Sequence, residues 1–199
     1  MAKKINLSLI FCFLFVSTYA QNKVNSGPMV GYSTMQEVLL WVQTVDKAKV
    51  HFEYYEVENP KIKYKTNQIQ TIKRKGFVAK LIADDVKPGK KYNYDLFIDD
   101  IKIQRDYKME FQTQELWKWR TDPPSVSFAI GSCSYVNEPE FDRPGKPYGS
   151  NFEIFNSINN KNPDFMLWLG DNMYLRESDW NSRTGFINRY SHTRALPEL

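Results

Sequence analysis

The chain has 199 residues, of which 42% are hydrophobic and 25% charged, an ordinary composition for a globular protein with one or two domains. The formal net charge of +4 is small, and the lysines are scattered along predicted strands rather than gathered on one face. This distribution argues against specific nucleic-acid binding.

The N-terminal segment is predicted to be a signal peptide. Two lysines precede an apolar run, residues 5–16, and the small residue Ala20 ends the segment. The run is shorter than the ~20 residues that a transmembrane helix needs. We therefore predict a signal peptide over residues 1–20, export to the periplasm or the extracellular space, and no transmembrane segment after cleavage. Cleavage would remove Cys12 and leave Cys133 without a cysteine partner in the chain.

Residues 21–114 are predicted to form an all-β sandwich of the fibronectin type III or immunoglobulin-like kind. The segment carries short runs with alternating apolar and polar residues, separated by turn-prone stretches. The clearest runs are Glu37–Thr44, Lys49–Glu58, Phe77–Ile82 and Tyr92–Ile98. Tyr92 follows a Pro-Gly turn and stands in the position of a tyrosine corner, whose hydroxyl bonds upstream backbone. His51, on a strand, is interpreted as a structural histidine and not as a ligand.

After a proline-containing linker, residues 115–125, the pattern changes to strand, helix, strand. Apolar strands are predicted over 126–130 and 164–169, and Ser150 or Asn151 is expected to cap a helix between them. Because both strands are almost entirely apolar, we predict a parallel pair that is covered on both faces. Residues 126–199 are thus interpreted as the first βαβ part of an α/β domain.

Metal-competent side chains follow both predicted strands. Cys133 comes after the first strand, and Asp171 comes after Gly170 at the end of the second, with Tyr174 three positions later. Sites in open α/β sheets lie at the carboxyl ends of the strands. Thiolate, carboxylate and phenolate together suit ferric iron, whereas calcium or magnesium alone would prefer oxygen ligands. The alternative is that Gly-Asp-Asn is an ordinary turn and that Tyr174 is an amphipathic surface residue.

The segment Gly170-Asp171-Asn172-Met173-Tyr174 is similar to the Gly-Asp-x-x-Tyr block of purple acid phosphatases and PhoD-like alkaline phosphatases. "NPDFMLWLGDNMYLRE" and "FAIGSCSY" resemble the PhoD-like family in particular, and "RYSHTRALPEL" looks like the helix that follows its tyrosine block. These families belong to the calcineurin-like metallophosphoesterases, and a β-sandwich ahead of the catalytic domain also fits them. The resemblance implies an exported phosphomonoesterase or phosphodiesterase in which a metal-bound hydroxide attacks the phosphorus of a phosphoester substrate.

The resemblance also implies a role for each site residue. Cys133 and Tyr174 would be ligands of Fe(III), and Asp171 would bridge the iron and a Ca²⁺ ion. Asn172 would lie just outside the ligands. The resemblance places no ligand at His192, which is expected to be a surface residue. Arg176 and Glu177 would orient the turn or nearby loops.

Two further expectations remain beside this interpretation. The family would continue beyond Leu199 with additional metal-binding blocks, so we expect the chain to be an incomplete metallophosphatase domain that is inactive by itself. The alternatives are a secreted adhesion or carbohydrate-binding module without enzymatic activity, which the sandwich favours, and a purple acid phosphatase relative, which the strand with Cys133 disfavours.

Overall fold

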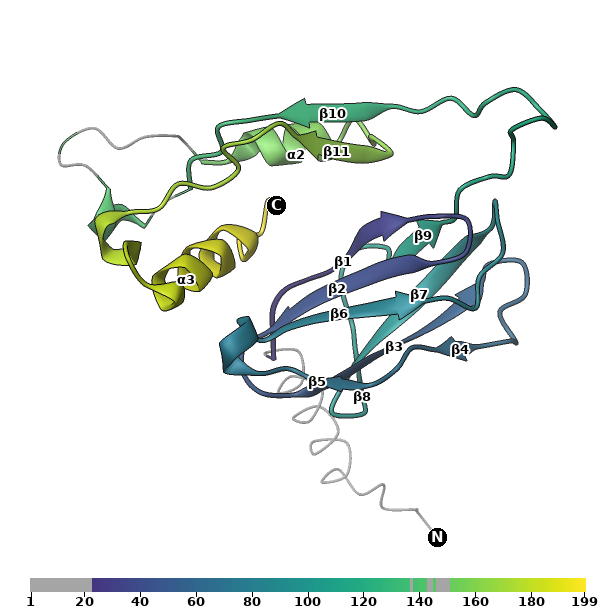
Figure 1. Ribbon diagram of the computed structural model, residues 1–199, viewed down its shortest axis with the longest axis horizontal. Coiled ribbons are helices and arrows are strands. Elements are labelled where there is room, and N and C mark those ends of the chain that lie inside the picture. Colours follow the sequence, from purple (N-terminus) through teal and green to yellow (C-terminus); the bar gives the residue numbers. More distant parts are fainter. Residues whose placement is uncertain (1–22, 137, 143–144, 146–150) are drawn as a thin grey trace, which may run out of the picture. The chain divides into compact units, whose positions relative to one another are not determined.

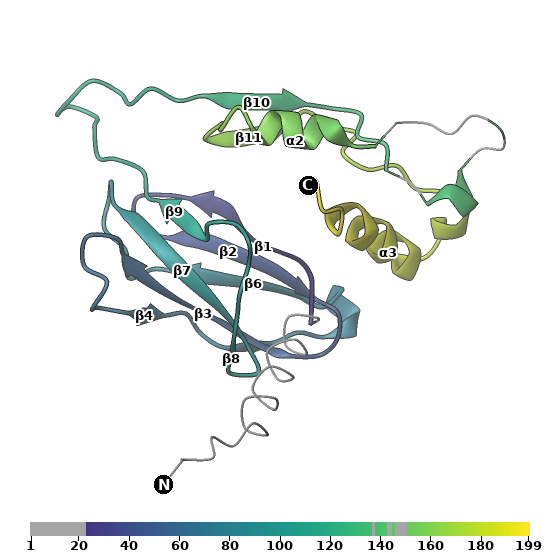
Figure 2. The same ribbon diagram turned by 180° about the vertical axis from the view of Figure 1, so that it is seen from behind.

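The computed structural model describes the chain over residues 23–136, 138–142, 145 and 151–199. The predicted signal peptide, residues 1–20, lies outside these described residues. The chain divides into two compact units between Arg120 and Thr121, a point inside the predicted linker. Figures 1 and 2 show the two units from opposite sides. No helix in the described part of the chain is long and apolar enough to cross a bilayer.

The first unit consists of two antiparallel sheets. One has the strand order β1-β2-β6, formed by Val24–Ser33, Val38–Thr44 and Val78–Ala83. The other has the order β4-β3-β7-β8, formed by Tyr64–Lys65, Lys49–Glu56, Lys91–Ile98 and Ile101–Ile103. Strands β5 (Ile69–Gln70) and β9 (Glu110–Gln112) pair with β3 and β7, and a 3₁₀ turn, η1 (Lys73–Lys75), precedes β6. The predicted sandwich is therefore confirmed at the level of its two sheets.

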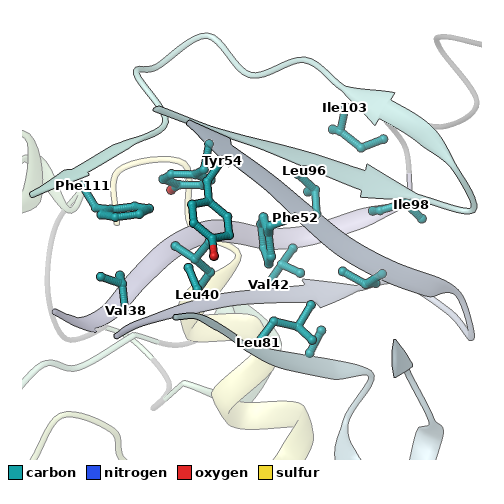
Figure 3. Close-up of a cluster of buried hydrophobic side chains, with 14 of the residues drawn as sticks. Val38, Leu40, Val42, Phe52, Tyr54, Leu81, Leu96, Ile98, Ile103 and Phe111 are labelled. Atoms are coloured by element: carbon teal, nitrogen blue, oxygen red, sulfur yellow. The ribbon is translucent and has the colours of Figure 1, made fainter. Parts of the chain in front are cut away.

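The core of this unit lies between the two sheets (Figure 3). Alternate residues of the long strands are fully buried, among them Leu40 on β2, Phe52 on β3 and Leu96 on β7. This is the period-2 pattern that predicted the strands, because successive side chains of a strand point to opposite faces. Phe111 of β9 stacks on Tyr92, with 5.1 Å between the ring centroids, and extends the core.

The predicted tyrosine corner is confirmed. The hydroxyl of Tyr92, at the start of β7, accepts a hydrogen bond of 2.9 Å from the backbone N–H of Lys87. The bond joins the strand to the turn that precedes it, five residues upstream. His51 on β3 is buried and stacks on Phe97, and its Nδ1 lies 3.4 Å from Gln68 Nε2. These contacts are those expected of a structural histidine.

The second unit begins with the parallel pair β10 (Phe128–Gly131) and β11 (Phe165–Trp168), joined through helix α2 (Glu153–Asn159). The predicted parallel pairing is confirmed, and the register places Gly131 beside Trp168. The helix starts at Glu153, and its N-cap is Phe152 in a left-handed conformation without a side-chain cap. The predicted cap at Asn151 was therefore wrong, and Ser150 lies outside the described residues.

Only one face of the β10–β11 pair is covered among the described residues. Helix α2 lies along that face (Figure 1). Phe155 of the helix packs near Trp168, with 6.4 Å between the ring centroids. On the opposite face four apolar side chains are each about half exposed: Phe128 at 51%, Ile130 at 57%, Phe165 at 49% and Leu167 at 46%. The prediction that both faces are covered is thus not met by the described chain. The continuous apolar sequence reflects two apolar faces, and only one of them has a partner here.

Two 3₁₀ turns and a helix complete the second unit: η2 (Pro139–Phe141), η3 (Glu177–Asp179) and α3 (Arg183–Arg194). Ser182 caps α3 by accepting a hydrogen bond of 2.9 Å from the N–H of Gly185. A Cβ atom added at Gly185 would lie 2.4 Å from the carbonyl oxygen of Asp179. Glycine therefore allows α3 to approach η3 closely.

Candidate metal centre

The candidate site lies where β10 and β11 end. The two loops that follow these strands are joined by backbone and side-chain hydrogen bonds. The N–H of Ser134 donates to the carbonyl of Asp171 at 2.9 Å, and the hydroxyl of Ser132 donates to the carbonyl of Gly170 at 3.2 Å. Because the strands are parallel neighbours, their carboxyl ends meet at one edge, and these bonds hold the two loops together there.

Both loops carry a residue with an unusual backbone conformation. Cys133 has a φ of 59° and Asp171 a φ of 48°, in the left-handed region that residues with a side chain rarely adopt. Gly170, between β11 and Asp171, has a φ of 117°. A Cβ atom at Gly170 would meet nothing within 4 Å, so the backbone angle, and not crowding, requires glycine there. Strained residues of this kind cluster at functional sites.

The three predicted ligands come together around one hydroxyl group. Tyr174 donates a hydrogen bond of 2.7 Å from its hydroxyl to Asp171 Oδ2. The side chain of Cys133 lies close enough to this hydroxyl to raise the pKa of Tyr174. Cys133 and Asp171 are exposed and Tyr174 is half-buried. A thiol, a carboxylate and a phenol, from two loops about forty residues apart in sequence, thus converge at the surface of the second unit.

The charges of this cluster oppose ionisation of the phenol. The Cys133 side chain, and then the hydrogen bond to Asp171, raise the pKa of Tyr174 well above its ordinary value of 10.0. Asp171 accepts a hydrogen bond from the protonated phenol and disfavours a second negative charge beside it, so Tyr174 stays protonated at neutral pH in these surroundings. A bound metal ion inverts this local effect, because a cation favours the anionic form of each group that contacts it.

The remaining residues named from the sequence lie around this cluster. Asn172 is exposed in the loop between Asp171 and Tyr174. Glu177 is exposed and starts η3. The side chain of His192, on α3, is about one-third exposed, and its Nδ1 lies 3.4 Å from Glu138 Oε1. His192 is therefore more enclosed than the surface residue that was expected. Arg176 is buried, with 7% of its surface exposed, and its guanidinium lies over the ring of Tyr135.

Sequence reasoning missed a buried ionic cluster next to the chain segment that follows Tyr174. Arg189 of α3 is fully buried, with its Nε 2.7 Å from Asp179 Oδ2 and its Nη1 2.5 Å from Glu138 Oε2. Asp179 Oδ2 also accepts the backbone N–H of Arg176 at 2.9 Å. The cluster therefore fixes the position of the chain just after Tyr174. An arginine inside a helix with a mixed surface gives no local signal of burial, so the sequence did not reveal it.

The donor set fits one part of a metal site. Sulfur, carboxylate oxygen and phenol oxygen are donors that suit ferric iron, and the carboxylate also suits calcium. Closed metal sites use about four to eight ligands. In the described ranges no group of three or more His, Cys, Asp or Glu side chains lies close enough to hold a metal ion. The Cys133–Asp171–Tyr174 cluster contains only two residues of these four types, because its third member is a tyrosine. The three side chains therefore offer part of a coordination shell.

Comparison with known proteins shows likeness at the level of the fold. Residues 21–116 match a family model described as a domain of unknown function, DUF7800. No curated protein matches the chain. A solved structure of PhoD is similar with a TM-score of 0.64 and 16% identity, covering 90% of this chain and 37% of that one. The purple acid phosphatase PPD1 from yellow lupin (Lupinus luteus) seeds is similar with a TM-score of 0.53 and 13% identity, covering 86% of this chain and 32% of that one.

The chain thus spans about one-third of the length of these two phosphatases. At such low identity the likeness concerns the fold alone. The chain shares the fold of the parts of PhoD and of the plant purple acid phosphatase that it covers.

Proposed function

We propose that this chain forms part of an exported, metal-dependent phosphoester hydrolase of the PhoD type, acting as a phosphomonoesterase or phosphodiesterase. The observation that carries the proposal is the convergence of Cys133, Asp171 and Tyr174 at the ends of two parallel strands. The fold shared with two phosphatases supports the same conclusion.

Each of the three residues would act as a metal ligand in this proposal. Cys133 and Tyr174 would hold ferric iron, and the two carboxylate oxygens of Asp171 would serve both the iron and a calcium ion. When bound, the two cations polarise the phosphoryl group and stabilise the charge that develops on its oxygens. Asn172 lies beside the ligands in the same loop and faces solvent.

Further structural elements complete the site in the active enzyme. Support comes from the half-exposed apolar face of β10 and β11, which carries Phe128, Ile130, Phe165 and Leu167. Two parallel strands with one uncovered apolar face are less stable than a pair covered on both faces, which is how parallel strands pack in α/β domains. That the 199-residue chain is inactive without such elements stays a prediction.

The proposal is tested by visible absorption spectroscopy of the complete gene product, expressed with iron and calcium. A phenolate bound to ferric iron gives a charge-transfer band, so the protein should be coloured, and Tyr174→Phe should lose the band and the bound iron. Tyr190→Phe is the matched control, because Tyr190 lies on α3 in the same unit and its ring contacts Phe186, with 4.8 Å between the ring centroids. Its band should be unchanged.

Hydrolysis of aryl phosphate mono- and diesters is measured on the same preparations. We expect activity in the wild type and in Tyr190→Phe, and its loss in Tyr174→Phe and after chelation. A colourless, metal-free wild type without phosphoesterase activity would contradict the proposal. Export is tested separately, by N-terminal sequencing of the secreted protein, which should begin at Gln21.

A further inference from the structure

Arg176 lies one aromatic ring away from the candidate metal centre. Its guanidinium carbon is 3.7 Å from the centroid of the Tyr135 ring, and that ring is 5.7 Å from the ring of Tyr174. The side chain is 7% exposed. A buried guanidinium stays charged, so the protein places a positive charge directly beside the loop that carries Tyr174.

Two donor atoms of this guanidinium have no acceptor among the residues that the structure describes. Nη1 donates to the carbonyl of Leu175 at 3.3 Å, whereas Nε and Nη2 are buried and have no hydrogen-bond partner among the described residues. Nε–H and one Nη2–H point in the same direction from one edge of the planar group. This edge is the fork that receives two oxygens of a carboxylate or phosphate side by side.

The main chain at Arg176 is held in place by Asp179, and the guanidinium is held by the Leu175 carbonyl and the Tyr135 ring. The backbone N–H of Arg176 donates to Asp179 Oδ2, and the same oxygen receives Arg189 Nε at 2.7 Å. That oxygen of Asp179 therefore already has two donors. Tyr135 covers a face of the guanidinium, while an oxyanion would bind in its plane at the edge, so the ring and an anion do not compete for the same position.

We propose that the Nε–Nη2 edge of Arg176 is a binding site for a phosphate oxyanion, and that in the enzyme it holds a phosphate group of the substrate beside the metal centre. The second half of this statement rests on the proposed function, whereas the first half does not. A buried cation with two unused donors favours an anion that can accept both, and phosphate supplies two oxygens and a full charge. Because the edge is closed to solvent, the side chains over it must shift when the anion enters.

The test uses the full 199-residue chain after treatment with a chelator, titrated with inorganic phosphate and followed by ³¹P NMR line broadening. We expect saturable binding to the wild type. Arg176→Met should weaken it at least tenfold. Arg176→Lys keeps a positive charge but lacks the two-pronged edge, so it should recover only part of the loss. Arg194→Met is the matched control, because Arg194 stacks on Tyr190 at 4.6 Å in the same unit, and it should bind as the wild type does.

The proposal is overturned if the wild type shows no saturable phosphate binding, if the wild type and Arg176→Met bind equally, or if Arg194→Met shows an equal loss. Acetate serves as the second probe, and acetate binding as tight as that of phosphate would reject phosphate in favour of a carboxylate. Circular dichroism shows whether each variant is folded, and Arg176→Lys gives the comparison if Arg176→Met does not fold. Since metal is removed, these outcomes do not depend on the iron band of Tyr174, which tests the proposed function separately.

Discussion

Arg189→Met should destabilise the second unit more than any surface substitution on the same helix. The Arg189 side chain is fully buried, and it contacts Asp179, whose side chain is 3% exposed, and Glu138, whose side chain is 23% exposed. Burial alone would lower the pKa of Arg189, but hydrogen bonds to Asp179 and Glu138 raise it, so the group is charged in the folded state. Methionine fills much of the same volume without the charge.

The expected loss of unfolding free energy in Arg189→Met follows from the acidic side chains that lose their partner. Removing one partner of a buried ion pair costs about 3–5 kcal/mol, because the other charge stays buried without compensation. Asp179 would keep only the backbone N–H of Arg176 as a donor among the bonds seen here. Glu138 is closer to solvent and can be rehydrated, so it adds little. We therefore expect a loss near the lower end, about 3 kcal/mol, in the free energy of unfolding.

Urea unfolding gives the free energy, and hydrogen exchange of the α3 amides by mass spectrometry assigns the loss to the second unit. Arg183→Met is the control, because Arg183 is exposed at the start of the same helix. The double variant Asp179→Asn/Arg189→Met should lose less than the sum of the two single variants, since the two changes remove the same pair. A loss below about 1 kcal/mol, the size of a surface ion pair, would refute the buried-pair reasoning.

Two further predictions concern pH and the sandwich. Burial would raise the pKa of Asp179, but hydrogen bonds from the Arg176 N–H and from Arg189 lower it overall. The charged Asp179 carboxylate therefore stabilises the folded state above the ordinary aspartate pKa of about 4. This stabilisation is lost as the pH falls through the lower pKa of the folded state. Acid unfolding of the second unit should therefore be less steep in Asp179→Asn, and an unchanged profile would argue against the pair. Tyr92→Phe removes the acceptor of the Lys87 N–H and should cost about 1 kcal/mol in urea unfolding, whereas no measurable loss would show that water replaces the bond.

The long strands of the sandwich could be predicted because their signal is local. Glu37–Thr44 was expected and Val38–Thr44 is observed, and Tyr92–Ile98 was expected where Lys91–Ile98 is observed. Strands of two or three residues, such as Tyr64–Lys65 and Ile69–Gln70, cannot be predicted from the sequence pattern. So short a segment has no measurable period, and it becomes a strand only because β3 offers it hydrogen bonds.

The candidate site was predictable for a different reason. Once two apolar strands pair in parallel, the residues after their ends must be neighbours, which places Cys133 near Asp171 and Tyr174. The sequence did not indicate that Tyr135 and Arg176 stack beside this cluster. Their contact joins two loops, and the path of a loop has no periodic pattern from which it could be predicted.

The sequence by itself determined which segments become long strands, the tyrosine corner at Tyr92, and the three donors at one sheet edge, because each depends on residue spacing within a short stretch or on one parallel pairing. Only the tertiary structure decided the rest. The Arg189–Glu138 pair joins residues 51 positions apart, and apolar residues of β10 and β11 look alike in sequence whether α2 covers them or not. Burial of a charge and coverage of a sheet face depend on what packs against them, and that is a property of the folded chain.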